Sequence, residues 1–185
     1  MKRFVVKIGD ITKCTADALV HPVSEQLESA GVVSEEIFRA AADSLKEELK
    51  ACGSCQPGSV VVTESHGLSV QKILHTVNPK WQGGDHNEEK ILADCYRNCL
   101  NQAVELGCKT IAFPSISTGA YHFPVNLAAK CSSENHSGLP EREPDFGRSF
   151  PYLSGPADNA GLRHVRRTIC KIEKATPDGG FFAVV

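Results

Sequence analysis

The stretch I-A-F-P-S-I-S-T-G-A-Y-H-F-P, residues 111–124, is the most informative part of this chain. A short apolar strand over Thr110–Phe113 runs into Pro114, a polar turn containing Gly119 follows, and Pro124 is placed to open a helix. Such a turn leaves backbone N–H groups free in front of the positive end of a helix dipole. A glycine there can adopt a positive φ angle and let the backbone wrap an oxyanion. The stretch predicts an anion-binding turn, and an ordinary strand-to-helix loop is the alternative that these residues leave open.

Short strands and helices alternate along the chain outside this stretch. The predicted strands cover residues 4–8, 18–20, 59–63, 72–77 and 110–113, and the predicted helices cover 34–50, 87–106 and 124–130. This order predicts a three-layer α/β/α fold with a mixed central sheet. Ligands of such folds sit at the carboxyl ends of the strands, where both the G-D-I turn at residues 9–11 and the S-T-G-A-Y turn at residues 117–121 lie.

Composition narrows the class of protein. A chain of 185 residues with 41% hydrophobic and 23% charged residues fits one globular domain. A net charge of −2 offers no basic footprint, so we expect no duplex nucleic acid partner. The apolar runs are shorter than the roughly 20 residues that a bilayer needs. The segment Met1–Lys7 lacks an apolar signal core, so we expect a cytoplasmic or nuclear protein without membrane contact.

The cysteines raise the question of a metal site. The chain has eight, and in a reducing compartment free thiols are the expectation. Cys52 and Cys55 have C-x-x-C spacing, and Cys95 and Cys99 lie one helical turn apart, so the four could in principle bind zinc. The first pair, however, follows a helix in a Gly/Pro-rich turn, and the second pair is typical of buried apolar filling. We therefore expect no metal.

Three motifs follow one another along the chain: G-D-I-T at 9–12, I-L-H-T-V-N-P-K-W at 73–81, and I-A-F-P-S-I-S-T-G-A-Y-H-F-P at 111–124. Together they resemble the macrodomain family, the ADP-ribose-binding α/β/α module, over roughly residues 3–131. The resemblance implies a nucleotide-binding site for ADP-ribose with no further cofactor.

The resemblance implies roles for particular residues. Asp10 should accept a hydrogen bond from the adenine amino group, with the Ile11 N–H nearby, although an Asp there is also a plausible helix cap. Phe123 should lie against the distal ribose, although by itself it fits a core aromatic equally well. The aromatic that often stacks on adenine falls in the unmatched C-terminal region, where Phe181 and Phe182 are loose candidates. The turn that should wrap the diphosphate consists of Ser117, Thr118, Gly119, Ala120 and Tyr121.

The other half of the implied site departs from the family pattern. Members read N-A-A-N after the second strand, whereas this chain reads H-P-V-S at residues 21–24. Ser24 lacks the planar amide that would contact the distal ribose and orient a water in hydrolases. His21 is the candidate base if the chain is a hydrolase, and His122 in the phosphate turn is a second one.

A second departure lies in the segment that is a glycine run in the family. This chain reads S-A-G-V-V-S-E at residues 29–35, so only Gly31 and Val33 match. Val32 places a β-branched side chain where the backbone should approach phosphate. Ser34 replaces an Asp that some hydrolases use, and a hydroxyl has no useful base strength near neutral pH.

Residues 132–185 depart from the pattern along their whole length. They are rich in Pro and Gly without a sustained apolar period, so we take 1–131 as the core and 132–185 as an atypical segment with a short basic helix over Leu162–Lys174. The family adds a central strand and a final helix here. The strand is hidden in Arg167–Ile172 or Gly180–Val185, or the tail replaces it.

The resemblance leads to a functional expectation. The chain is similar to the secondary macrodomains of multi-macrodomain ADP-ribosyltransferase proteins, which act as readers. We expect it to bind ADP-ribose or mono-ADP-ribosylated protein and to lack efficient hydrolysis. Two alternatives stay open: an ADP-ribosyl hydrolase that uses His21 or a backbone-held water, and a structural or interaction domain that binds no nucleotide.

Overall fold

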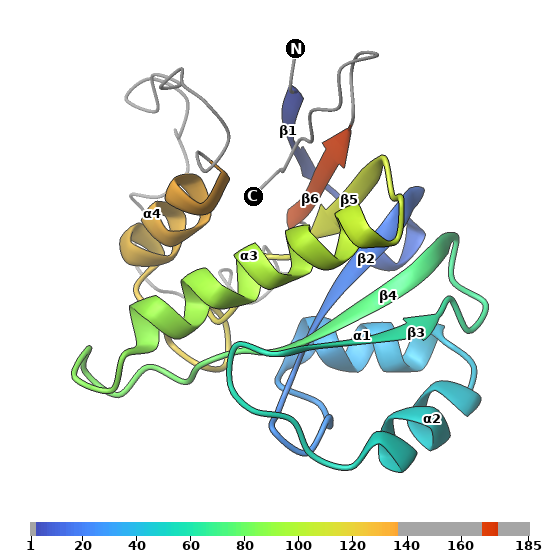
Figure 1. The fold of residues 1–185 in the computed structure, drawn as a ribbon, viewed down its shortest axis with the longest axis horizontal. Helices are drawn as coiled ribbons and strands as arrows, with labels where there is room; N and C mark the ends of the chain where they lie inside the picture. Colours follow the sequence, from blue (N-terminus) through green and yellow to red (C-terminus); the bar gives the residue numbers. More distant parts are fainter. Residues whose placement is uncertain (1–2, 137–167, 174–185) are drawn as a thin grey trace.

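The computed structural model describes residues 3–136 and 168–173 (Figure 1). Its elements in chain order are β1 (Arg3–Ile8), the 3-10 helix η1 (Ile11–Lys13), β2 (Ala16–Val23), α1 (Val32–Ala40), α2 (Ser44–Cys52), β3 (Val60–Glu64), β4 (Val70–Val77), α3 (Glu88–Glu105), β5 (Thr110–Phe113), α4 (Val125–His136) and β6 (Thr168–Glu173). The alternation of strands and helices predicted from the sequence is confirmed.

The six described strands form one mixed sheet in the order β1-β6-β5-β2-β4-β3. β2 pairs in parallel with β4 and β5, while β6 is antiparallel to both β5 and β1, and β3 is antiparallel to β4. It follows that β1, β5, β2 and β4 point the same way and end at one edge. The loops after these four strands therefore meet along that edge, which is where parallel strands present ligand sites.

Helices cover both faces of the sheet, as Figure 1 shows. Alternate residues of β2 divide between the two cores, because successive side chains of a strand point to opposite faces. Ala18 and Val20 belong to the cluster under α3 and α4, whereas Leu19 and Val23 belong to the cluster under α1 and α2. This arrangement is the predicted three-layer α/β/α fold.

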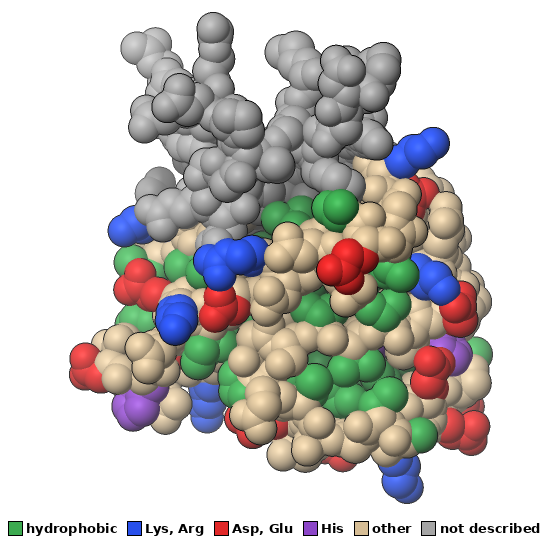
Figure 2. Space-filling model, in the orientation of Figure 1, with side chains coloured by type: hydrophobic (Ala, Val, Ile, Leu, Met, Phe, Trp, Pro, Cys, Tyr) green, Lys and Arg blue, Asp and Glu red, His purple; other side chains and the backbone are tan. Residues whose placement is uncertain are grey.

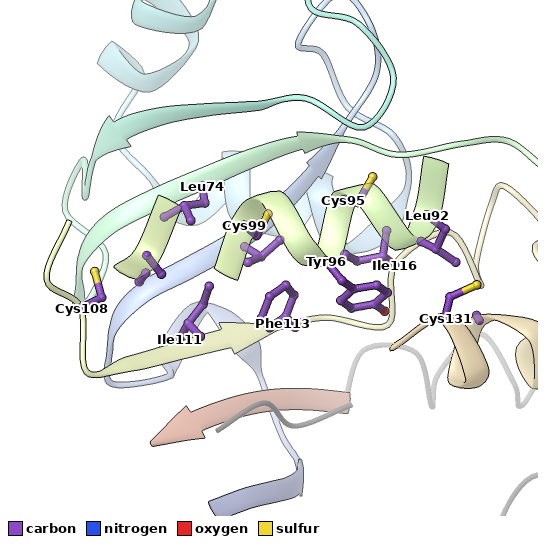
Figure 3. Packing of buried hydrophobic residues seen from close by; sticks show 14 of the residues in the cluster. Leu74, Leu92, Cys95, Tyr96, Cys99, Cys108, Ile111, Phe113, Ile116 and Cys131 are labelled. Atoms are coloured by element: carbon purple, nitrogen blue, oxygen red, sulfur yellow. The ribbon is translucent and has the colours of Figure 1, made fainter. Parts of the chain in front are cut away.

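In Figure 3 the Tyr96 side chain of α3 points toward Phe113 of β5. Tyr96 lies against Phe113 with ring centroids 5.3 Å apart, and both are buried. Beyond the helix end, Gly107 adopts a φ of 71°, and the Cys108 N–H donates to the Ala103 carbonyl oxygen. This bond, from the second residue past the C-cap Leu106, is the Schellman arrangement, which confirms Gly107 as the stop signal.

The single helix predicted over residues 34–50 is wrong, because the structure contains two. Ala41 is extended, with φ −79° and ψ 160°, and the Ala42 N–H leaves the helix to donate to the His66 carbonyl oxygen at 2.8 Å. α2 then restarts after Asp43. The apolar periodicity runs through both helices, since Ile37 and Leu45 pack into the same core, so periodicity alone could not show the break.

The C-terminal part joins the sheet. α4 runs to His136, beyond the predicted Lys130, and Thr168–Glu173 forms β6 between β1 and β5. The predicted basic helix is therefore wrong over these six residues, where the β-branched Thr168, Ile169 and Ile172 favour a strand. The last strand thus lies in the first of the two places considered. Phe181, Phe182 and the remainder of the tail lie outside the described residues.

The positions of the cysteines and the character of the surface bear on whether a metal ion, a membrane or a charged partner could bind. Among residues 3–136 and 168–173, no group of three or more His, Cys, Asp or Glu could hold a metal ion. Cys95 and Cys99 are buried while Cys52 is exposed, so the two pairs do not form one site. No helix of the described part is long and apolar enough to span a bilayer. Basic and acidic side chains are interspersed over the described part of the face in Figure 2.

Candidate functional site

The predicted site residues follow the strands that end at the common edge. Asp10 comes after β1, the turn 115–121 after β5, Ser24 after β2, and Asn78 after β4. Since the sheet order is β1-β6-β5-β2-β4, these loops are arranged along the edge in that same sequence. An elongated ligand lying along the edge would meet Asp10 first and Asn78 last.

The turn 117–121 presents free backbone donors. In the part of the chain that the structure describes, the N–H groups of these five residues have no hydrogen-bond acceptor. The turn is closed from within, because the His122 N–H donates to the Gly119 carbonyl oxygen at 2.9 Å and the Phe123 N–H to that of Ser117 at 3.0 Å. A row of free N–H groups on a closed turn suits an anion.

The positive φ angles of this turn fall at Ser117 (64°) and His122 (53°), not at Gly119 as the sequence suggested. A positive φ is costly for a residue with a side chain, so surrounding contacts must hold it. The Ser117 hydroxyl supplies such contacts. It donates to the Pro79 carbonyl oxygen at 2.8 Å and accepts from Asn78 Nδ2 at 2.9 Å.

The N-P-K-W segment, residues 78–81, thus supports the turn directly. The Trp81 N–H donates to the Tyr121 carbonyl oxygen at 3.0 Å, and the Trp81 ring meets Phe123 edge-on at 4.9 Å. Phe123 is only 2% exposed. Of the two roles considered for Phe123, core aromatic and ribose contact, its position is that of a core aromatic.

The N-terminus of α1 faces this turn. Gly31 precedes the helix with φ 133°, and among the described side chains none caps the helix. A Cβ atom built on Gly31 would lie 3.1 Å from the Ala120 Cβ and 4.0 Å from the Ala120 N. Two sets of free N–H groups, one on the turn and one on the first turn of α1, therefore lie side by side. Val33 is half-buried and packs against the core below.

Asp10 lies apart from these turns and caps η1. Its Oδ1 accepts from the Thr12 N–H at 3.0 Å and from Thr12 Oγ1 at 2.7 Å, while Ile11 is buried. The Thr12 hydroxyl is the main cause of a lowered Asp10 pKa, with smaller contributions from the Thr12 N–H and Lys13 against the effect of burial. The carboxylate is exposed, so capping leaves it accessible.

His21 is fully buried, which removes it as a base that could act on solvent water. Its Nε2 lies 2.7 Å from Ser34 Oγ and its Nδ1 lies 2.9 Å from His75 Nδ1, while His75 Nε2 lies 2.9 Å from Thr63 Oγ1. Thr63 Oγ1 donates to the Glu64 carbonyl oxygen, so it accepts from His75. The order of neutral tautomers then follows: Ser34 donates to His21, His21 to His75, and His75 to Thr63.

His21 and His75 both remain neutral. Burial, and then the neighbouring His75, lowers the pKa of His21 well below its usual range. Burial, and then His66, lowers the pKa of His75 to about 3. The Ser34 hydroxyl donates to His21, so it is directed into the core. The hydrogen bonds connect β3, β4 and β2 to the first turn of α1.

A pocket of about 370 Å³ opens at the far end of the edge from Asp10. Its lining includes Ser24, Glu25, Asn78, Lys80, Glu88 and Tyr121. Burial would raise the pKa of the Glu88 carboxyl, but backbone N–H groups, including those of Gln82, Gly84 and His86, lower it to about 2. The Glu88 carboxylate therefore holds one wall of the pocket in place. No pattern in the sequence singled out Glu25 or Glu88, and Asn78 was noted only as part of a motif.

Comparison with known proteins identifies the family. The Macro domain family model matches residues 20–132, more than half of the chain. The chain belongs to the macrodomain family. A Macro domain-containing protein of Lactiplantibacillus plantarum is 46% identical over 121 residues, which are 65% of this chain and 70% of that protein.

Two further macrodomains bear on the ligand. A protein of Cronobacter turicensis named O-acetyl-ADP-ribose deacetylase is 40% identical over 146 residues, or 77% of this chain and 83% of that protein. The Trypanosoma brucei macrodomain in complex with ADP-ribose matches with a TM-score of 0.63 at 29% identity, covering 69% of this chain and 53% of that one. The site geometry thus occurs in a family with ADP-ribose-binding members.

The structure brings together some of the predicted ligand residues and separates others. Gly31 lies against Ala120, and Ser24 and Tyr121 line one pocket. Asp10 and Ile11 stand at the other end of the edge. The segment H-P-V-S turns its histidine into the core while Ser24 stays at the surface, where its Oγ accepts from the Glu28 N–H at 3.1 Å.

Proposed function

We propose that this macrodomain is a reader that binds ADP-ribose, free or attached to protein. The observation that carries the proposal is the meeting of two sets of free backbone N–H groups where Gly31 lies against Ala120. Aligned N–H groups at a helix N-terminus favour an anion, and two such sets facing each other suit a diphosphate. Adenine would then lie toward Asp10 and the distal ribose toward Ser24. A reader of this kind acts in the cytoplasm or the nucleus.

The buried hydrogen-bond network of Ser34, His21, His75 and Thr63 supports a reader rather than a hydrolase. Hydrolysis needs a base positioned against a water. Ser34 is directed to His21, His21 is buried among Ser34, His75 and Phe38, and Ser24 offers only a hydroxyl. The residues at the positions of the family's catalytic Asn and Asp therefore provide no such base.

Titration calorimetry with ADP-ribose tests the proposal. We expect micromolar affinity, about −8 kcal/mol. Asp10→Ala should weaken binding, but it also removes the cap of η1, so Thr12→Val is the matched control. The valine removes the hydroxyl partner of Asp10 and keeps the carboxylate. Weakening by Asp10→Ala alone supports an adenine contact, whereas equal weakening by both variants assigns Asp10 to structure. A folded chain that releases no heat with ADP-ribose refutes the proposal.

A hydrolase is the second candidate, because the Cronobacter turicensis relative is named O-acetyl-ADP-ribose deacetylase. Incubation of the chain with O-acetyl-ADP-ribose and with mono-ADP-ribosylated protein, followed by chromatography of the products, separates the two functions. Turnover above the buffer blank would make it an enzyme. If His21→Ala abolished the turnover at unchanged thermal stability, the buried hydrogen bonds of His21 would have to open during catalysis.

A further inference from the structure

The pocket that Ser24 and Tyr121 help to line lies at the end of the edge where the distal ribose is proposed to sit. Along the edge of the sheet it lies past the anion-binding turn, on the side opposite Asp10. ADP-ribose is linear, so a ligand with adenine at Asp10 and its diphosphate at the turn directs the distal ribose toward Ser24. Whatever is attached to that ribose then enters the pocket. This reasoning rests on the proposed function.

The walls of the pocket are held in place without a ligand. The Glu88 carboxylate accepts from Gln82, Gly84 and His86 on one side. On the other side, the Glu25 carbonyl oxygen accepts from the Cys55 N–H at 2.8 Å. The volume of about 370 Å³ is within the range of roughly 300–1,000 Å³ that is usual for small-ligand sites. Walls fixed beforehand lower the entropic cost of binding.

Hydrogen-bond acceptors are available among the lining residues. Within the described residues, the Glu25 carboxylate has no ion-pair or hydrogen-bond partner. Its field reaches the end of the turn: burial first, and then Glu25, raises the pKa of the Tyr121 hydroxyl. Asn78 is 6% exposed, and its Oδ1 is buried without a hydrogen-bond donor in the described part of the chain. Lys80 also lines the pocket.

We propose that this pocket receives the acceptor side chain of a mono-ADP-ribosylated protein and that Glu25 favours arginine as that acceptor. An arginine-linked ADP-ribose keeps a planar, positively charged guanidinium with several N–H donors next to the distal ribose. A carboxylate is the natural partner of such a group. A serine-linked ADP-ribose has an uncharged glycosidic oxygen at the same place and offers Glu25 neither charge nor donor.

The test uses the full chain, free ADP-ribose and two synthetic peptides of one sequence, mono-ADP-ribosylated on an arginine or on a serine at the same position. Calorimetry gives the ratio of the two peptide dissociation constants. We expect the arginine-linked peptide to bind about two- to fivefold more tightly, the range that an exposed charge pair provides. Glu25→Gln should bring the ratio close to one. Glu28→Gln, which removes an exposed carboxylate three residues away, is the matched control and should leave the ratio unchanged.

The outcomes separate this inference from the function on which it rests. Equal affinity for the two peptides in the native chain, or an equal loss of preference in Glu25→Gln and Glu28→Gln, overturns the role of Glu25 while binding of free ADP-ribose continues. Failure to bind free ADP-ribose overturns the reader function itself, and the inference with it. Thermal unfolding of each variant verifies that it is folded.

Discussion

The two turns that meet at Gly31 and Ala120 use their polar side chains in opposite directions. In the turn after β5, Ser117 binds to Asn78 and Pro79, and these bonds hold open a row of free N–H groups. In the segment after β2, Ser34 donates its hydroxyl into the core, to His21. The first turn is thus built to face a ligand, while the second supplies little beyond its backbone. If the chain binds a diphosphate as proposed, its backbone donors are retained while the side chains of Ser34 and His21 stabilise the core.

The largest effect should come from closing the gap between the turns. Gly31→Ala places a Cβ 3.1 Å from the Ala120 Cβ at a φ of 133°, so Ala120 must give way by a few tenths of an ångström and the alanine backbone is strained. The strained φ costs about 1–3 kcal/mol of folding stability with or without ligand. Because the two sets of N–H groups would no longer be aligned, we expect roughly 30-fold weaker ADP-ribose binding by calorimetry, about 2 kcal/mol. The double variant Gly31→Ala with Ala120→Gly relieves the contact but not the φ strain, so it should recover part of the loss. Unchanged affinity in Gly31→Ala would show that the two turns do not act together in binding ADP-ribose.

The burial of His21 and His75 in their neutral forms can be tested by varying the pH. Because the pKa of His75 is lowered to about 3 by folding, the unfolded chain takes up a proton below its usual pKa of about 6.5 and the native chain does not. The free energy of unfolding should therefore fall as pH drops, by about 2 kcal/mol for His75 between pH 7 and pH 5, and further until about pH 3. Urea unfolding at several pH values measures this.

His75→Gln is the control for that pH dependence. Whatever its stability at pH 8, the further loss on acidification to pH 5 should be smaller than in the native chain. Glu88 does not interfere, since its lowered pKa makes its contribution disappear only as pH falls from about 4.5 toward 2. A native chain as stable at pH 5 as at pH 7 would mean that the two histidines are not buried in neutral form.

The support of the open turn predicts a smaller loss. Ser117→Ala leaves the buried Asn78 amide and the Pro79 carbonyl oxygen without their partner, a cost of about 1–2 kcal/mol in the free energy of unfolding. Binding of ADP-ribose should weaken as well, because the positive φ at position 117 loses its contacts. Thr118→Val, which removes the less buried hydroxyl bonded to Ser115, should cost less. Equal losses in both variants would argue against a special role for Ser117.

The smallest expected effect is a gain. Val32→Gly removes a β-branched side chain from the first turn of α1, next to the free N–H groups. We expect about threefold tighter ADP-ribose binding, which corresponds to roughly 0.7 kcal/mol. Glycine also weakens the helix by up to about 1 kcal/mol, so affinity and thermal stability should be measured together. Weaker binding at unchanged stability would show that Val32 contacts the ligand favourably.

Local patterns predicted most of the elements. β5, the turn after it and the stop of α3 at Gly107 each follow from short-range signals and appear in the structure. The break between α1 and α2 did not follow, because it depends on the His66 carbonyl oxygen, which comes from a distant loop. β6 was one of several open possibilities, since a strand between β1 and β5 is defined by its neighbours rather than by its own pattern.

The sequence alone identified most of the strands and helices and, through three motifs, the family. It also predicted an anion-binding turn after β5. The directions of the polar side chains became clear only from the way the strands and helices pack together. His21, Ser34 and Phe123 each carry chemistry suited to a site, yet all three are buried in the core. The reason is that burial and hydrogen-bond partners depend on which segments the sheet brings together. Spacing along the chain records only which residues lie near one another in sequence.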